Sequence, residues 1–336
     1  MSMEAVARVA LVHAPTPLDP LERLSAELGG PRLWIKRDDC TGLAGGGNKS
    51  RKLEYVVAAA EAAGADALLT FGALQSNHAR QTAAAAARRG LACDLVLTDS
   101  VPREVDGYGR GGNLLLDALL GARIHRLEPG EEAAVRAERI IAEHAAAGRH
   151  CVEVALGASD PVGALGYVRC ADEVRAQCAQ ADIRPVAVLH ASASGGTQAG
   201  LLAGLRAAGD GLRVIGVDVW HPDVQVVVDR VRGIASATLE RIAPGVRLRP
   251  ADVEVLDGFL GPGYGLPSAE MVEAVQRLAR SEGILLDPVY SGKAFAALLA
   301  LVRAGAFAAD EDVVFLHTGG TATLGVYTSA LVEASV

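Results

Sequence analysis

The sequence alternates short apolar runs with segments of helical periodicity along most of its length. Val186–His190 and Val313–Leu316 have the length and composition of buried strands, and the alanine-rich stretch Ser76–Arg89 has those of a helix. Strands that alternate with helices in this way form parallel sheets joined by crossover helices, with binding sites at the carboxyl ends of the strands. The sequence therefore predicts an α/β fold with mostly parallel sheets.

The other predicted elements continue this alternation. Strands are expected over residues 32–37, 67–71, 93–97, 123–127, 152–154 and 213–219. Helices are expected over residues 18–28, 49–63, 113–120, 131–147, 168–180, 271–281 and 293–303, with one more that begins at Gln198. Loop composition predicts a domain boundary near residues 160–166.

With 336 residues, half of them hydrophobic, the chain can bury one large core or two smaller ones without disulfides. The net charge of -8, with no basic block, argues against a nucleic acid or an anionic membrane as partner. Five scattered cysteines without a Cys-x-x-Cys pair indicate reduced thiols rather than a zinc site or a disulfide framework. We identify no signal peptide in Met1–Ala14 and no bilayer-spanning run, so we expect a cytoplasmic protein without a metal.

A run of glycines, Gly45–Gly47, leads through Asn48 to Lys49 at the predicted start of a helix. Glycine lets a ligand approach the main chain closely. A lysine at the mouth of such a loop can be a buried amine that performs covalent chemistry. The alternative is a flexible surface loop with a solvated lysine.

Residues 192–197, Ser-Ala-Ser-Gly-Gly-Thr, join a predicted strand to a predicted helix. Their amides and hydroxyls would surround the helix N-terminus, where the dipole favours an anion, so the loop predicts a phosphate site. It lacks the Gly-Lys-Ser/Thr of a Walker A loop and the G-x-G-x-x-G of a dinucleotide fold. The alternative is a tight turn that binds nothing.

Further polar and aromatic residues are placed for ligand contact. Ser76, Asn77 and His78 follow a strand at the start of a helix, where Ser76 can also be a simple N-cap and His78 a satisfied polar residue. Tyr264 and Tyr290 stand in predicted loops of a chain with only 4% aromatic residues. A tyrosine face can stack on a flat ring, and its hydroxyl can orient or move a proton.

One explanation accounts for the lysine, the phosphate site and the loop tyrosines together. They suit a flat, phosphorylated aldehyde, and pyridoxal phosphate is the cofactor of that chemistry, in which the ring accepts the electrons of an α-carbanion. A nucleotide-binding α/β protein is the plainer alternative.

Five segments together carry a family resemblance: Gly46–Glu54, Gln75–Gln81, Gly261–Pro267, Asp287–Lys293 and His317–Gly320. They resemble the 1-aminocyclopropane-1-carboxylate deaminase/D-cysteine desulfhydrase family of pyridoxal-phosphate enzymes, occur in the family's order and span nearly the whole chain. The resemblance implies the tryptophan synthase β-like fold, fold type II, with two three-layer α/β domains of mostly parallel sheets. It implies a large domain of residues 1–54 plus 166–336, a smaller inserted domain of residues 55–165, and a homodimer.

The resemblance also implies roles for single residues. Lys49 would form the Schiff base and take the α-proton, Asn77 would bond the ring hydroxyl, and Tyr290 would stack on the ring. The remaining implied contacts are the phosphate with Ser194, Gly195, Gly196 and Thr197, the cofactor with Ser291 and Thr318, and the amino-acid substrate with Ser76, Asn77, His78 and Tyr264. Lys49, Ser76, Tyr264 and Tyr290 are the expected catalytic residues.

Three departures separate subfamilies. The family's deaminases carry Glu where Ser291 stands, Leu where Thr318 stands, and often Gln where His78 stands. A carboxylate near the pyridine nitrogen keeps it protonated and strengthens the electron sink, whereas hydroxyls leave it neutral more easily. A weaker sink suffices when a good β-leaving group departs, and a cyclopropane ring has none. Thr321–Thr323 also departs from the Ala-Pro-Ala-like segment of the family.

We therefore expect a pyridoxal-phosphate-dependent β-eliminating lyase that converts D-cysteine to pyruvate, ammonia and sulfide. L-cysteate sulfo-lyase and 1-aminocyclopropane-1-carboxylate deaminase are the enzymatic alternatives. A catalytically silent pyridoxal-phosphate-binding protein is the alternative from another class.

Overall fold

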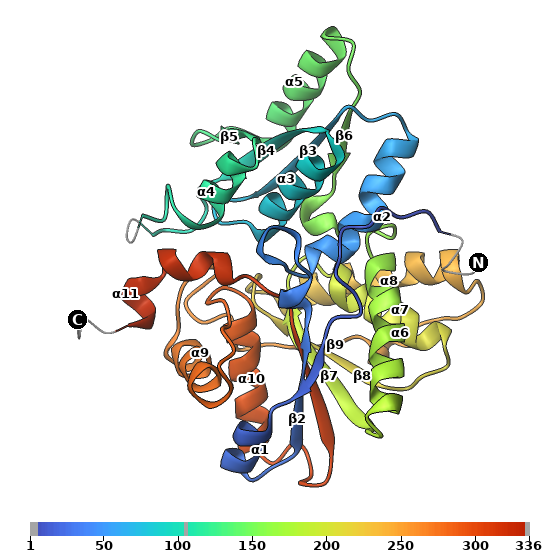
Figure 1. Cartoon of the computed structure of the whole chain (residues 1–336), viewed down its shortest axis with the longest axis vertical. Coiled ribbons are helices and arrows are strands. Elements are labelled where there is room, and N and C mark those ends of the chain that lie inside the picture. Colours follow the sequence, from blue (N-terminus) through green and yellow to red (C-terminus); the bar gives the residue numbers. More distant parts are fainter. Residues whose placement is uncertain (1–5, 104–106, 333–336) are drawn as a thin grey trace.

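Two sheets organise the computed structural model, which describes residues 6–103 and 107–332 (Figure 1). The six-stranded sheet has the order β1 (Leu18–Pro20), β2 (Arg32–Arg37), β10 (Asp312–His317), β7 (Pro185–Ser192), β8 (Arg213–Asp218), β9 (Glu254–Leu256). The four-stranded sheet has the order β5 (Arg123–Arg126), β4 (Ala92–Thr98), β3 (Ala67–Ala73), β6 (Cys151–Val154). Neighbouring strands are parallel in both sheets except for β1, which pairs antiparallel with β2.

Helices cover both faces of the six-stranded sheet. One face packs against α6 (Leu165–Gln180), α7 (Gly196–Ala207) and α8 (Val224–Ile242), and the other against α1 (Glu22–Leu28), α9 (Ala269–Glu282) and α10 (Ser291–Arg303). Alternate residues of β10 point to the two layers, so that Val314 packs towards α7 while Phe315 meets Phe295 of α10 edge-on.

The four-stranded sheet is covered in the same way. Helices α2 (Lys49–Ala62), α3 (Asn77–Arg89) and α4 (Gly112–Leu119) pack on one face and α5 (Ala133–Ala146) on the other. The short helix α11 (Thr328–Leu331) ends the described chain. Within these residues, no helix is both long and apolar enough to cross a bilayer.

The predicted α/β class with mostly parallel sheets is confirmed, and so are most predicted elements. The stretch 18–28 is not one helix, because it divides into β1 and α1 at Pro20. The helix expected from Gln198 begins two residues earlier, at Gly196, and β3 continues through Gly72 and Ala73, which were expected in a loop. The predicted domain boundaries stay a prediction, to which the separate pairing of β3–β6 lends support.

Candidate active site

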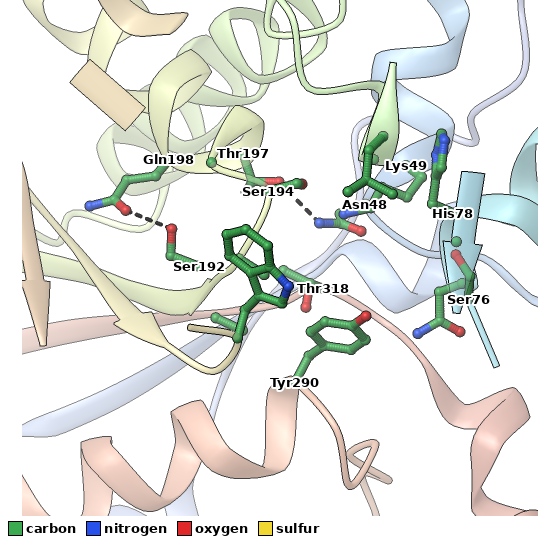
Figure 2. A pocket seen from close by; sticks show the side chains of 18 of the residues that line it. Asn48, Lys49, Ser76, His78, Ser192, Ser194, Thr197, Gln198, Tyr290 and Thr318 are labelled. Carbon is green, nitrogen blue, oxygen red and sulfur yellow. Dashed lines mark hydrogen bonds between the residues drawn. The ribbon is translucent and has the colours of Figure 1, made fainter. Parts of the chain in front are cut away.

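A pocket with an empty volume of about 820 Å³, solvent at its mouth included, lies where the carboxyl ends of β3, β7 and β10 meet (Figure 2). Ten of the predicted site residues line it: Lys49, Ser76, Asn77, His78, Ser194, Gly195, Thr197, Tyr264, Tyr290 and Thr318. Two others, Gly196 and Ser291, are buried behind its wall. Residues far apart in the chain thus converge at one place, as expected for parallel sheets.

Lys49 is the first residue of α2 and lies half-buried in the pocket wall. Burial lowers the pKa of its amine to about 8, because the charged form loses solvation. A substantial fraction of the amine is therefore neutral near physiological pH, which suits a nucleophile or a base.

The glycine loop before Lys49 is held by close packing. Gly46 has a φ of 73°, and a Cβ there would lie 1.9 Å from the carbonyl oxygen of Asp39. A Cβ on Gly319, which follows β10, would lie 2.7 Å from the Cα of Gly47. Only glycine allows these approaches. They bring the end of β10 against the loop, where the amide of Asn48 donates to the Thr318 carbonyl at 3.0 Å.

The predicted phosphate loop forms the N-terminus of α7. Gly195 has a φ of 83° and directs the chain into the helix, whose first amides have no partner within the helix. Ser194 and Thr197 line the pocket beside it, and Asn48 Nδ2 donates to Thr197 Oγ1 at 3.0 Å (Figure 2). This set of donors suits a phosphate group.

A buried lysine stands behind this loop. Lys52 is completely buried, and its Nζ donates to Ser159 Oγ at 2.9 Å and to the Gly157 carbonyl at 3.1 Å. Ser159 Oγ lies 2.7 Å from Ser194 Oγ and accepts from the Gly196 amide at 3.3 Å. Lys52 therefore adds positive charge to the phosphate loop. Burial lowers its pKa well below the ordinary value.

Two asparagines fix the orientation of the predicted ring-hydroxyl ligand. The Nδ2 group of Asn113 donates to Asn77 Oδ1 at 2.9 Å and to the Gln75 carbonyl at 2.9 Å, while Asn113 Oδ1 accepts from Arg80 Nε at 2.8 Å. Because Asn77 uses its oxygen in this network, its NH₂ group is left as the donor for the pocket.

The two predicted tyrosines face each other across the pocket wall. Their rings are 5.9 Å apart with an interplanar angle of 62°, and their hydroxyls are hydrogen-bonded to each other. Burial raises the pKa of both phenols, so each keeps its proton at neutral pH.

Ser291, predicted to contact the cofactor, begins α10 behind Tyr290. Its hydroxyl donates to Asp287 Oδ1 at 2.6 Å, and Asp287 also accepts the amides of Val289, Tyr290 and Ser291. The carboxylate of Asp287 is thus occupied at the start of the helix. Among the described residues that line the pocket, none is an aspartate or a glutamate.

Several pocket residues were not predicted. Lys52 could have been found, because residues three apart share one face of a helix and Lys49 was already a candidate. Asn48, Trp220 and Arg230 also line the pocket, and the Arg230 guanidinium lies 5.1 Å from the centre of the Trp220 ring. No local pattern points to Arg230, since it faces the pocket only through the packing of α8.

This fold and this site define a pyridoxal-phosphate enzyme of fold type II. The residues fit the cofactor, since the α7 N-terminus suits its phosphate, Asn77 presents a donor, and Lys49 is a partly neutral amine. A family model described as "Pyridoxal-phosphate dependent enzyme" matches residues 9–319, and the chain belongs to that family.

Similar proteins agree with this assignment. The chain is 42% identical over 328 residues to a 1-aminocyclopropane-1-carboxylate deaminase of Methylobacterium sp. (strain 4-46), covering 96% of this chain and 97% of that protein. It is 40% identical over 332 residues to the deaminase of the same name from Burkholderia vietnamiensis (strain G4 / LMG 22486), covering 97% and 98%.

Solved structures agree as well. The crystal structure of an ACC deaminase homologue superposes with a TM-score of 0.87 at 35% identity, covering 98% of this chain and 96% of the other. A threonine deaminase from Thermus thermophilus, at 21% identity and a TM-score of 0.64 over 91% and 92%, shares the fold. The predicted family, fold type, cofactor and lyase or deaminase class are confirmed, and family membership replaces the nucleotide-binding alternative.

Proposed function

We propose that the chain is a pyridoxal-phosphate-dependent lyase that eliminates the β-substituent of a cysteine-like amino acid, with D-cysteine as the leading substrate. The observation that carries this proposal is the pocket lining, which contains hydroxyls such as that of Thr318 and, among the described residues, no carboxylate. Without a carboxylate the pyridine nitrogen is not held protonated. The weaker electron sink then favours a substrate whose β-sulfur leaves readily.

Each predicted site residue has a part in this reaction. The bound cofactor supplies the electron sink for the α-carbanion. Its phosphate is held by the Ser194–Thr197 loop with the charge of Lys52 behind it, and Asn77 donates to the ring oxygen. The amine lone pair of Lys49 takes the α-proton, the β-thiolate leaves, and the resulting aminoacrylate hydrolyses to pyruvate and ammonia.

Ser76 and the tyrosine pair face the substrate side. Ser76 Oγ accepts the Ala79 amide at 3.1 Å as the N-cap of α3, so its own proton remains available to a substrate carboxylate. The N-cap and the substrate-contact interpretations of Ser76 are therefore compatible. Tyr264 and Tyr290 present protonated hydroxyls to the reacting carbons and the leaving group.

Two other substrates have specific support. The relatives at 40–42% identity carry the name 1-aminocyclopropane-1-carboxylate deaminase, which favours that activity as the second candidate. Arg230 is a cation in the pocket lining, which a sulfonate would need, and so supports L-cysteate. We also propose that the enzyme is a cytoplasmic homodimer, which light scattering of the purified protein tests for the dimer.

A substrate panel decides among these candidates. The purified enzyme is given D-cysteine, L-cysteine, D-cysteate, L-cysteate and 1-aminocyclopropane-1-carboxylate, and pyruvate, 2-oxobutanoate, sulfide and sulfite are measured. Pyruvate with sulfide from D-cysteine is the expected result. Formation of 2-oxobutanoate as the main product would replace the proposal with the deaminase. A yellow protein that releases no keto acid from any of the five would indicate the silent cofactor-binding protein.

Lys49→Ala tests the role of the lysine. The variant should lose the visible absorbance of the bound cofactor and all turnover, because no amine remains to bond the cofactor or take the α-proton. Lys49→Arg is the matched control for charge, since it keeps a cation that does not deprotonate. It should be equally inactive, and pyruvate release from either variant at the wild-type rate would exclude Lys49 as the base.

A further inference from the structure

A chain of two hydrogen bonds fixes the protonation of the His78 ring. Thr70 Oγ1 donates its single proton to the Val154 carbonyl at 2.8 Å, and the same oxygen lies 2.7 Å from His78 Nε2. Because the threonine has no second proton, Nε2 must carry the hydrogen and donate it. Thr70 is completely buried and His78 is 4% exposed, so water does not compete for these bonds.

The other ring nitrogen of His78 is consequently a lone pair. Within residues 6–103 and 107–332, His78 Nδ1 is buried and has no hydrogen-bond partner. His78 lines the pocket, and Figure 2 shows its ring next to the side chain of Lys49. Burial, with the nearby amines of Lys49 and Lys52, lowers the pKa of His78 well below its ordinary value, so the ring stays neutral.

A buried acceptor without a partner beside a reactive amine has a clear use. When Lys49 is not bonded to the cofactor, its four-carbon side chain is flexible and its ammonium needs an acceptor. A hydrogen bond to the charged form of a group favours that form and raises its pKa. An acceptor next to Lys49 would therefore both hold the amine in place and strengthen it as a base.

We propose that His78 Nδ1, held as a lone pair by Thr70, is the hydrogen-bond acceptor that positions the free amine of Lys49. No proton passes from Lys49 to His78, and Lys49 keeps the α-proton it has taken. His78 is thus a positioning residue for the proposed base, and the inference rests on the proposed function in this respect. It would also explain why a histidine that cannot readily become charged stands in the pocket.

Thr70→Val tests the inference, because valine keeps the shape of threonine and removes the oxygen that accepts from Nε2. Thr82→Val is the matched control: Thr82 is equally buried in the same region, but its hydroxyl donates to the main-chain carbonyl of His78 at 3.0 Å and not to the ring. The ring tautomer is read by ¹⁵N NMR of the holoenzyme labelled at histidine, with His78→Asn to assign the signal.

The pH dependence of Lys49 is read separately. The full-length chain is freed of cofactor and mixed with pyridoxal phosphate, and the rate at which Lys49 captures it is followed by absorbance across pH. The apparent pKa of this rate should fall by about one unit in Thr70→Val, the equivalent of losing one hydrogen bond to a charged group. Thr82→Val should match the wild type in both measurements.

The expected NMR result is a neutral His78 with its proton on Nε2 in the wild type and a mixture of tautomers in Thr70→Val. A wild-type proton on Nδ1 would overturn the inference, and so would an unchanged capture profile in Thr70→Val. Neither measurement needs a substrate. An enzyme that behaves as expected here but eliminates no β-substituent would therefore count against the proposed function and not against the role of His78.

Discussion

The orientation of one amide decides whether Asn77 helps or hinders the cofactor. Its NH₂ group can face the pocket only because Asn113 donates to its oxygen, and Asn113 is itself fixed by Arg80. A carboxamide presenting its oxygen to the ring hydroxyl would place two acceptors against each other. The site therefore depends on a residue 36 positions away in the chain, outside the pocket lining.

Asn113→Asp isolates this effect. The carboxylate keeps the acceptor for Arg80 but has no proton for Asn77, so the Asn77 amide should turn its NH₂ towards Asp and its oxygen towards the pocket. We expect cofactor affinity to fall at least about tenfold, the cost of one lost hydrogen bond with an unpaired acceptor left behind. Titration of the cofactor-free protein with pyridoxal phosphate measures it.

Asn113→Leu gives the control for this variant, because it removes both bonds and also leaves Arg80 without its acceptor. It should lower thermal stability more than Asn113→Asp, whose charge can pair with Arg80. Equal cofactor affinity in Asn113→Asp and the wild type would show that the orientation of Asn77 is not set by Asn113.

At the scale of elements, helix α10 fixes the loop that carries Tyr264. The Nζ of Lys293, which is 1% exposed, donates to the carbonyls of Leu260 and Gly263 at 2.6 and 2.9 Å. Tyr290 stands at the N-terminus of the same helix. One helix therefore sets both members of the tyrosine pair.

Lys293→Met should release this loop while keeping the length and apolar stem of the side chain. The two carbonyls lose their donor, which costs about 1 to 3 kcal/mol of stability, and amide hydrogen exchange over residues 258–266 should quicken. Turnover should fall more than cofactor affinity, because Tyr264 faces the substrate. Arg303→Met on the same helix, which removes only an exposed ion pair with Glu273, should change neither measurement.

The sequence was most informative where one local pattern decides an element. Arg32–Arg37 and the alanine-rich α3 were placed within a residue, since periodicity alone specifies them. The stretch 18–28 shows the opposite case, because Leu21 and Leu24 have helical spacing but Pro20 stands on an edge strand that only the pairing with β2 defines. Helix α8 was missed although Val227, Val231 and Ala235 recur on one face.

The site divides along the same line. The residues that line the pocket were found because they stand in loops directly after strands or at helix starts, where parallel sheets place their ligands. Asn113, Ser159 and Arg230 were not, because each reaches the site through tertiary packing and has no motif of its own. The tautomer of His78 likewise depends on Thr70 and Val154, which only the pairing of β3 with β6 brings together.

At the scale of the whole molecule, buried charges join the elements around the site. Arg51, in the first turn of α2 with Lys49, donates to both oxygens of Asp38 at 2.8 Å and to Glu173 of α6 at 2.8 Å. This network ties α2 to the end of β2 and to α6, and the attraction of Arg51 and its hydrogen bonds hold the pKa of Asp38 below its usual value despite burial. The helix that carries Lys49 is therefore anchored to the large sheet.

A second buried acid has no such partner. Asp117 of α4 is completely buried, and neither of its oxygens has a hydrogen-bond partner within the described residues. Burial raises the pKa of its carboxyl to about 7, against a weaker opposing effect of the Arg80 charge. The folded protein therefore binds a proton here that the unfolded chain releases near pH 4. The contribution of this group to stability is present at low pH and is lost as the pH rises through about 7.

Asp117→Asn should consequently stabilise the protein, and more so above pH 7 than at pH 5. The amide removes the cost of a buried charge, and we expect a gain of about 1 to 3 kcal/mol at pH 8, with a smaller gain at pH 5, where the native Asp117 is already protonated. Thermal unfolding of both proteins at the two pH values measures the difference. Asp229→Asn on the exposed surface of α8 is the control and should change stability by less than about 1 kcal/mol at either pH. A gain that is equal at both pH values, or a loss at pH 8, would show that Asp117 is charged and compensated in the folded protein.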